Sequence, residues 1–317
     1  MILKQIHAWT LLIFVSYFIL LLSLNITGPD YASYTSTAQL GITNNFFKLK
    51  EFLSFFIIDS FSNYESSVEY LGLKIFSSIS FSLLFLCSYR LIIEQLQNVD
   101  LNQSLHTNAK IIILNLTFFV CLTPFVNLLA LSALRQSLAL IFLSSAILMI
   151  GRKNFFKAFI AFLLSLICHN SAIIFLPLFA FIFFKNNNLR FFLIFAASII
   201  YFFLSFYIPY QPSVDSDNRI IYGFFSIFCI SLFIVKRKSY SEIDLILFAS
   251  IFLTLAFFQL ESYYDRLGLY SAFFGAILVS KKIITTRPLK ASLFISLIAI
   301  VFTFTFVALV TYPPLIS

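Results

Sequence analysis

The sequence has few charged residues, because only 11% of its 317 residues are Asp, Glu, Lys or Arg whereas 61% are hydrophobic. This balance leaves too little polar surface to cover a soluble globule, and it excludes a water-soluble enzyme or binding domain. Cysteine is also scarce: there are four, and no two form a Cys-x-x-Cys pair, so the usual redox and zinc patterns are absent. No fixed-period repeat or soluble segment stands out. We therefore expect a single transmembrane domain over residues 1–317.

Long apolar runs are what the sequence has in abundance. A bilayer core about 30 Å thick needs about 20 apolar residues in a helix, and we read eleven such runs: residues 8–24, 70–93, 111–131, 134–150, 155–168, 172–184, 191–208, 220–235, 243–260, 267–280 and 291–310. The sequence therefore predicts an all-α polytopic integral membrane protein with about 11 transmembrane helices.

The basic residues are distributed unevenly between the predicted loops. With a cytoplasmic N-terminus, 15 of the 21 Lys and Arg residues fall at inner positions, as the positive-inside rule requires. The six outer ones are Lys48, Lys50, Lys74, Arg135, Arg219 and Arg266. An odd number of spans then puts the C-terminus in the periplasm. The net charge of +8 reflects this pattern, and no motif points to nucleic acid as a partner.

One predicted outer loop, residues 25–69, is much longer than the others. Its middle, "FFKLKEFLSFFIID", is too charged to span a bilayer but has apolar residues at helical spacing. Such a segment is typical of an amphipathic helix lying in the membrane interface. A lid or a packing helix is the alternative interpretation.

Four polar side chains are expected at a similar depth below the outer surface. Counted from the inner ends of their spans, Arg135, His169, Arg219 and Arg266 lie 14–16 residues along, or about 21–24 Å at 1.5 Å per residue. Charges at such depth are tolerated where they are buried in protein or line a wet cavity. A single arginine can instead snorkel to the headgroups, and a single histidine can be structural. Together, the four indicate a cavity that opens outward.

Arginine is well suited to bind phosphate, since its guanidinium stays charged and donates two hydrogen bonds as a fork. A cavity at the level of the lipid with several arginines therefore points to a lipid phosphate or diphosphate as substrate.

The stretch beginning at Leu134, "LRQSLALIFLSSAILMIGRKNFFKAFIAFLLSLICHNSAIIFLPLFAF", resembles the signature region of the EpsG-type family of exopolysaccharide and O-antigen (Wzy-type) polymerases. It has an Arg-Gln-x-x-Ala span, a short basic turn, a span that ends in a histidine, and a span with a proline. "GPDYASY", "ESSVEYLGL" and "YYDRLGLY" agree with the family more loosely.

The resemblance implies glycosyl transfer at the outer face of the bacterial inner membrane, on an architecture similar to GT-C glycosyltransferases. Such enzymes move a growing glycan from undecaprenyl diphosphate to a second lipid-linked repeat unit. The implied partners are the undecaprenyl-diphosphate-linked oligosaccharide, the bilayer, a chain-length regulator and a flippase.

The resemblance also suggests roles for residues near the predicted cavity. His169 or Asp30 is the expected general base, with Asp265 next. The expected substrate-binding residues are Arg135, Gln136, Arg219, Arg266 and Tyr34, the last because its ring can stack on a sugar.

A metal site was considered at Asp215-x-Asp217, which has a spacing that GT-C enzymes use. The same residues are ordinary turn formers, and arginines can neutralise the diphosphate instead. We therefore expect neither a metal nor another cofactor.

Two other classes compete with a polymerase. A lipid-linked oligosaccharide flippase or polysaccharide exporter would also have many spans and a basic cavity, although such folds often show internal repeats. A membrane acyltransferase would use a histidine, usually on the cytoplasmic side, whereas the charge pattern puts His169 outside.

Overall fold

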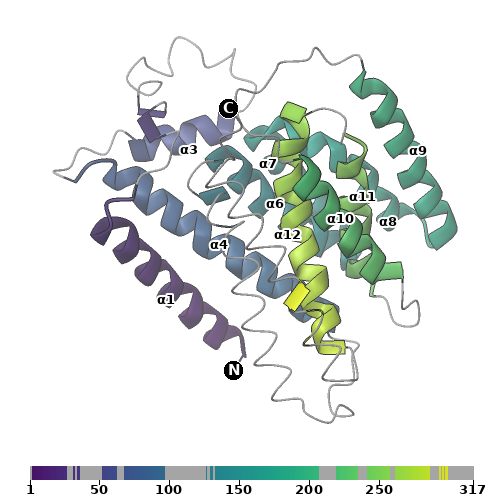
Figure 1. The fold of residues 1–317 in the computed structure, drawn as a ribbon, viewed down its shortest axis with the longest axis horizontal. Helices are drawn as coiled ribbons and strands as arrows, with labels where there is room; N and C mark the ends of the chain where they lie inside the picture. Colours follow the sequence, from purple (N-terminus) through teal and green to yellow (C-terminus); the bar gives the residue numbers. More distant parts are fainter. Residues whose placement is uncertain are drawn as a thin grey trace, which may run out of the picture. The chain divides into compact units, whose positions relative to one another are not determined.

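The computed structural model is helical, with no strand among the residues that it describes (Figure 1). These are residues 2–26, 31–32, 34–35, 52–62, 68–96, 126, 129–130, 133–206, 219–234, 241–257, 261–285, 293, 295 and 297–298. The all-α class predicted from the apolar runs is confirmed over this part of the chain.

Most of the helices coincide with the predicted runs, although the first and the last described helices begin six residues earlier than predicted, and the helix at residues 52–62 corresponds to no predicted run. They are α1 (Ile2–Ser23), α3 (Phe52–Ser62), α4 (Leu71–Leu96), α6 (Leu134–Gly151), α7 (Phe155–Cys168), η3 (Asn170–Phe179), α8 (Ala180–Phe183), α9 (Asn187–Ser205), α10 (Arg219–Ile234), α11 (Glu242–Leu255) and α12 (Glu261–Thr285). Most of the predicted runs 111–131 and 291–310 lies outside the described residues.

Three of the described helices are long and apolar enough to cross a membrane: residues 71–95, 134–151 and 187–205. The structure is that of an α-helical membrane protein. The total of eleven spans and the sides on which the two termini lie stay predictions. In the predicted outer loop, α3 forms where helical spacing was seen, and its location in an interface also stays a prediction.

The predicted span at 172–184 differs from its neighbours because it begins as a 3₁₀-helix, η3. Pro177 lies inside it and has no N–H to donate, which disfavours a regular α-helix. A 3₁₀-helix rises about 2 Å per residue, so η3 and α8 together extend roughly 26 Å in only fourteen residues. The tighter winding lets a short run cover much of the thickness of a bilayer.

The chain divides into two compact units. The first contains residues 1–90, 126–149 and 155–173. In it α1 lies beside α4, where the rings of Tyr17 and Phe81 stack at 4.0 Å (Figure 1), and α3 packs against α7. Its core joins the loop, α3, α4, α6 and α7 through Tyr31, Tyr34, Ile58, Leu73, Phe76, Leu134, Leu138, Ala139 and Cys168.

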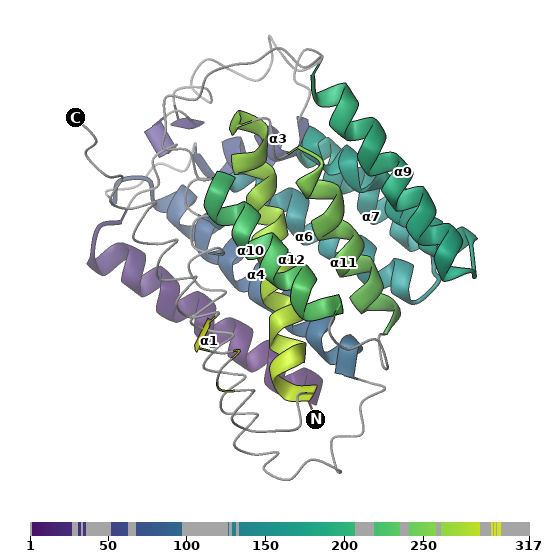
Figure 2. The same ribbon diagram turned by 45° about the vertical axis from the view of Figure 1, so that its right-hand side comes forward.

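The second unit contains residues 91–125, 150–154 and 174–317. Its helices α10, α11 and α12 lie side by side, and α9 runs along α11 (Figure 2). Aromatic rings join α9 to α11, with Phe191 5.9 Å from Phe248 and Tyr201 5.7 Å from Phe257.

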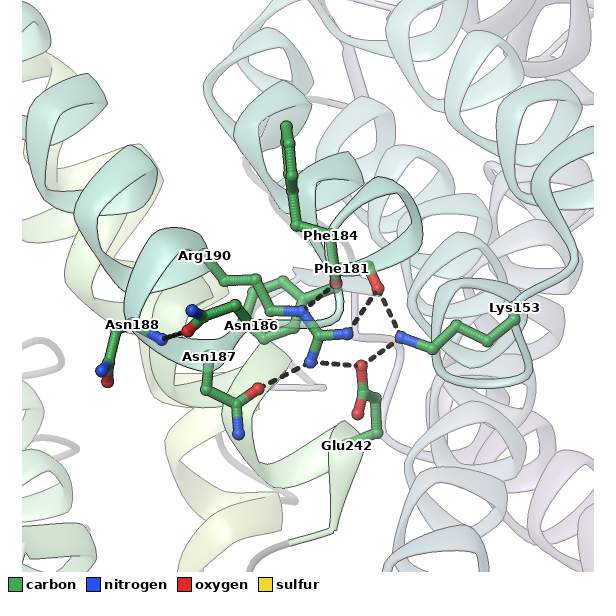
Figure 3. Close-up of polar contacts among 8 residues, drawn as sticks. All are labelled: Lys153, Phe181, Phe184, Asn186, Asn187, Asn188, Arg190 and Glu242. Carbon is green, nitrogen blue, oxygen red and sulfur yellow. Dashed lines mark hydrogen bonds and ion pairs between the residues drawn. The ribbon is translucent and has the colours of Figure 1, made fainter.

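An ionic network holds several connecting segments of the second unit together. Figure 3 shows Lys153 and Arg190 converging on Glu242 at the start of α11, with the Arg190–Glu242 contact at 2.9 Å. Arg190 is 4% exposed, and its Nη2 also donates to the carbonyl oxygen of Phe181 at 3.2 Å. Asn186 caps α9 by accepting a hydrogen bond from the N–H of Asn188 at 2.9 Å. The network therefore fixes the start of α9 against the start of α11.

A second ion pair in this unit is buried. Asp244 is 1% exposed, forms an ion pair with Lys281 of α12 and accepts a hydrogen bond from Gln95 Nε2 at 2.8 Å. The same carboxylate accepts from the N–H of Ser241, and Ser241 Oγ accepts from the N–H of Asp244, which makes a capping box. The side chain of Asp244 thus caps the start of α11 and links this helix to α4 and α12.

Candidate functional site

Arg135 lies at the start of α6, in the first unit. It is half-buried, and its guanidinium carbon lies 5.0 Å from the centre of the Phe55 ring on α3. A guanidinium at this distance from an aromatic face is attracted by the ring's quadrupole. The contact holds the guanidinium of Arg135 against α3, the helix of the predicted outer loop.

His169 lies at the same end of the helical hairpin as Arg135. The helices α6 and α7 run antiparallel, because a tight turn joins them in which Lys153 has a φ of 57°. Ser165 Oγ on α7 donates to the carbonyl oxygen of Ala139 on α6 at 2.8 Å. His169 lies one helical turn after Ser165 on α7, and Arg135 lies one helical turn before Ala139 on α6. The register therefore brings them to the same level.

The hydrogen bonds of His169 define its tautomer. The N–H of Ser171 lies 3.2 Å from Nδ1 of His169, and Ser171 Oγ lies 2.6 Å from the same nitrogen. A backbone N–H can only donate, so Nδ1 is an acceptor and the proton of the neutral imidazole is on Nε2. The side chain is 7% exposed. His169 is therefore arranged as a hydrogen-bond donor through Nε2–H, and a role as base at Nε2 would require the other tautomer.

Gln136, the residue after Arg135, carries a buried donor without a partner. The side chain is 4% exposed, and its Nε2 makes no hydrogen bond with the described residues. An unsatisfied buried donor costs about 1–3 kcal/mol, and native proteins contain few of them. A polar ligand that accepts this hydrogen bond would remove the cost. This donor is consistent with a polar ligand at the start of α6, but Ser80, Ser82 and Ser144 of the same unit also carry buried hydroxyl oxygens without a hydrogen bond to the described residues.

Two tyrosines of the predicted outer loop belong to the same core cluster as Leu134 and Cys168. Tyr31 Oη donates to the carbonyl oxygen of Leu73 at 3.4 Å and bonds with Ser77 Oγ. Burial raises the pKa of Tyr31 to about 12, so the phenol stays protonated at neutral pH. Tyr34 is also buried and packs in the core of the first unit.

Lys74, counted from the sequence only as an outer cation, is a buried residue of α4. Its side chain is 0% exposed and Nζ donates to Asn25 Oδ1 at 2.9 Å. A charged residue within the apolar run at 70–93 was the signal that could have singled it out.

The structure does not describe the side chains of the other predicted site residues. Asp30, Asp215 and Asp217 lie outside the described residues. Arg219 is in α10, and Asp265 and Arg266 are in α12, but their side chains also lie outside the described part. Thus the structure places Arg135, Gln136 and His169 at the same end of the α6–α7 hairpin, with Tyr34 in the same unit. Within the described residues, no group of three His, Cys, Asp or Glu side chains is arranged to hold a metal ion.

Comparison with known proteins decides the family. A model of the EpsG family matches residues 8–315. The chain belongs to the EpsG family. No curated protein and no solved structure matched the sequence.

For an EpsG-family protein, the apolar helices and the family together indicate a membrane protein of polysaccharide biosynthesis with a polymerase-like role. The chemistry available at the start of α6 suits an anionic and hydroxylated ligand. Arg135 supplies a fixed positive charge, and Gln136 Nε2 and His169 Nε2–H supply neutral donors. Preorganised donors of this kind stabilise negative charge that develops on a leaving group.

Proposed function

We propose that this EpsG-family protein is an O-antigen or exopolysaccharide polymerase. It transfers a glycan from undecaprenyl diphosphate to a lipid-linked repeat unit at the periplasmic face of the bacterial inner membrane. The observation that carries the proposal is the match of the chain to the EpsG family over residues 8–315. The register of the α6–α7 hairpin, which puts Arg135 and His169 at the same level, supports it.

The proposed architecture is a single membrane domain with about 11 spans, similar to GT-C enzymes, with the N-terminus in the cytoplasm. The networks of the second unit support this orientation. They join Arg152 to Glu94, and Lys153 and Arg190 to Glu242, and all of these residues belong to segments with an inner position in the proposed topology. The α6–α7 turn is then cytoplasmic, and the opposite end with Arg135 faces the periplasm.

Reporter fusions test this topology. A reporter after Lys153 or Lys238 is expected to read cytoplasmic, and one after Asp217 periplasmic, because the 15 inner basic residues resist translocation. The measurement is paired alkaline phosphatase and green fluorescent protein activity at each site. A periplasmic signal after Lys153 would contradict the proposed orientation and with it the outward-facing site.

In the proposed reaction, breaking the anomeric C–O bond leaves negative charge on the departing lipid diphosphate. Arg135 binds two of its oxygens, and Gln136 and His169 donate further hydrogen bonds. Arg219 and Arg266 stay substrate-binding residues predicted from the sequence. Tyr34 contacts a sugar ring. Since Nδ1 of His169 already accepts from Ser171, a carboxylate is the better acceptor for the proton of the attacking hydroxyl. Asp30 and Asp265 are the sequence-predicted carboxylates for that role, and the reaction needs no metal ion.

Variants of His169 distinguish a donor from a base. If His169 acts as a hydrogen-bond donor, His169→Ala is expected to slow chain growth by about 10²-fold, a typical cost of removing one preorganised donor. His169→Gln keeps an N–H and should retain a large part of the activity, with the same pH profile as the wild type between roughly pH 5.5 and 8, the range in which an unperturbed imidazole titrates.

If His169 is the general base, the same assay of chain growth gives a different result. If His169→Gln were as slow as His169→Ala, and wild-type activity fell as pH dropped through the imidazole range, the donor role would be wrong and His169 would be the base.

A strain lacking the protein tests the proposed function. We expect its surface glycan, separated by size on a gel, to collapse from a ladder to a single repeat unit, and the ladder to return when the wild-type protein is supplied. An unchanged ladder in the deletion strain would contradict a polymerase.

A further inference from the structure

His169 lies in a turn that holds its backbone from both sides. Its N–H donates to the carbonyl oxygen of Ser165 at 2.9 Å, at the end of α7, and its own carbonyl oxygen accepts from the N–H of Ala172 at 3.1 Å, at the start of η3. Ser165 is itself tied to α6 through its hydroxyl, and Ala172 is 0% exposed. Because the backbone of His169 is fixed in this way, what remains to be set is the position of the proton on its side chain.

Ser171, two residues further along, presents two hydrogen-bond donors to the imidazole of His169. Its backbone nitrogen lies 3.2 Å from Nδ1, and its Oγ lies 2.6 Å from the same atom. Because the N–H can only donate, Nδ1 carries no proton and is an acceptor, and the hydroxyl must then donate to it as well. The hydroxyl oxygen is the nearer of the two donor atoms, so the side chain of Ser171 makes the closer contact.

These two contacts favour one tautomer of the neutral imidazole. The nitrogen that carries the proton is set by the hydrogen bond that the other nitrogen makes. In the alternative tautomer, a proton on Nδ1 would face the N–H of Ser171, and the hydroxyl would have to turn in order to accept. A substitution of the side chain removes the hydroxyl and keeps the N–H, so the contribution of the hydroxyl can be measured by itself.

We propose that Ser171 is a positioning residue that acts through His169. Its hydroxyl donates to Nδ1 and so keeps the proton on Nε2, the nitrogen that donates to the departing diphosphate in the proposed reaction. This rests on the proposed polymerase function. An ionised diphosphate oxygen only accepts hydrogen bonds, as an unprotonated Nε2 does, so the other tautomer would set two acceptors against each other. Ser171 thus determines whether His169 stabilises the leaving group or opposes it.

The tautomer can be read directly by nitrogen-15 NMR of the full-length protein in liposomes. The chain has three histidines, and the substitutions His7→Gln and His106→Gln leave only His169 to carry the label. Protonated and unprotonated imidazole nitrogens give well-separated signals. At roughly pH 8, the upper end of the range in which an unperturbed imidazole titrates, we expect a proton on Nε2 and none on Nδ1. Ser171→Ala should raise the share of the other tautomer about 2–10-fold, the effect of one neutral hydrogen bond, and Ser171→Thr, which keeps the hydroxyl, should not.

Chain growth by purified variants shows whether the hydroxyl acts through His169. Ser171→Ala is expected to lower turnover about 2–10-fold in the wild-type background. In the His169→Gln background it should have no further effect, because glutamine has no Nδ1 for the hydroxyl to bond, and only coupled residues depart from additivity in this way. Ser60→Ala is the control, at an exposed serine of α3 in the same unit, and should be near normal in both backgrounds.

Three results would overturn the role of Ser171. They are a proton on Nδ1 in the wild type, equal tautomer populations in the wild type and Ser171→Ala, and an equal slowing of both backgrounds by Ser171→Ala, which would indicate a merely structural part in the turn. The first of these needs no variant of Ser171. Absence of chain growth with the wild type would instead contradict the polymerase, and the NMR spectra would still decide whether Ser171 sets the tautomer.

Discussion

Arg135→Ala is expected to remove nearly all chain growth, the largest effect on activity of any substitution outside the base. The guanidinium offers a planar fork of N–H donors to two diphosphate oxygens. Its removal takes away the main positive charge at the start of α6, and the loss of even one preorganised donor typically costs about 10²–10³-fold in turnover. The measurement is the rate of polymer formation by purified variants with a lipid-linked repeat unit.

Further variants separate the contribution of the two parallel donors of Arg135 from the contribution of its positive charge. Arg135→Lys keeps the charge but not the two parallel donors, so it should regain only a small part of the lost activity. Arg90→Ala is the control variant, because Arg90 is exposed and lies near the C-terminal end of α4. It should leave chain growth near that of the wild type. Full polymerisation by Arg135→Ala would reduce Arg135 to a residue that only extends toward the headgroups.

Asp244→Ala is expected to cause the largest loss of stability. Removing one partner of a buried ion pair leaves the other charge uncompensated and costs about 3–5 kcal/mol. Here the substitution would strand the ammonium of Lys281, remove the acceptor for Gln95 and break the capping box with Ser241. We expect a clearly lower midpoint in thermal unfolding of the detergent-purified protein, with Asp244→Asn in between.

The control for this prediction is an exposed ion pair in the same unit. Arg152 contacts Glu94 at 2.7 Å, but its side chain is 53% exposed, and exposed pairs contribute about 0–1 kcal/mol. Arg152→Ala should therefore unfold close to the wild type. A midpoint of Asp244→Ala equal to that of Arg152→Ala would show that the buried pair does not hold α11 and α12 together.

The sequence was a good guide where local pattern determines structure. The apolar runs on either side of "GRKN" predicted α6 and α7 to within a residue, because the basic turn interrupts the hydrophobic pattern sharply. Counting residues at helical rise predicted a common level for Arg135 and His169, and the Ser165–Ala139 hydrogen bond has the register that this count requires. Their depth in a bilayer stays a prediction.

Other features depend on contacts between distant residues, which hydropathy does not contain. The 3₁₀ geometry of η3 was missed because a proline in an apolar run does not by itself distinguish a kinked α-helix from a tighter one. The partnership of Asp244 with Gln95 and Lys281 joins residues 149 and 37 positions apart.

The central claim, that this EpsG-family protein extends a glycan, is tested most directly by reconstituting the purified protein in liposomes with an undecaprenyl-diphosphate-linked repeat unit as its only substrate. We predict products longer than one repeat unit, with one undecaprenyl diphosphate released for each unit added, and neither product with Arg135→Ala. Movement of the lipid-linked unit across the bilayer without any increase in glycan length would contradict a polymerase and identify a transporter.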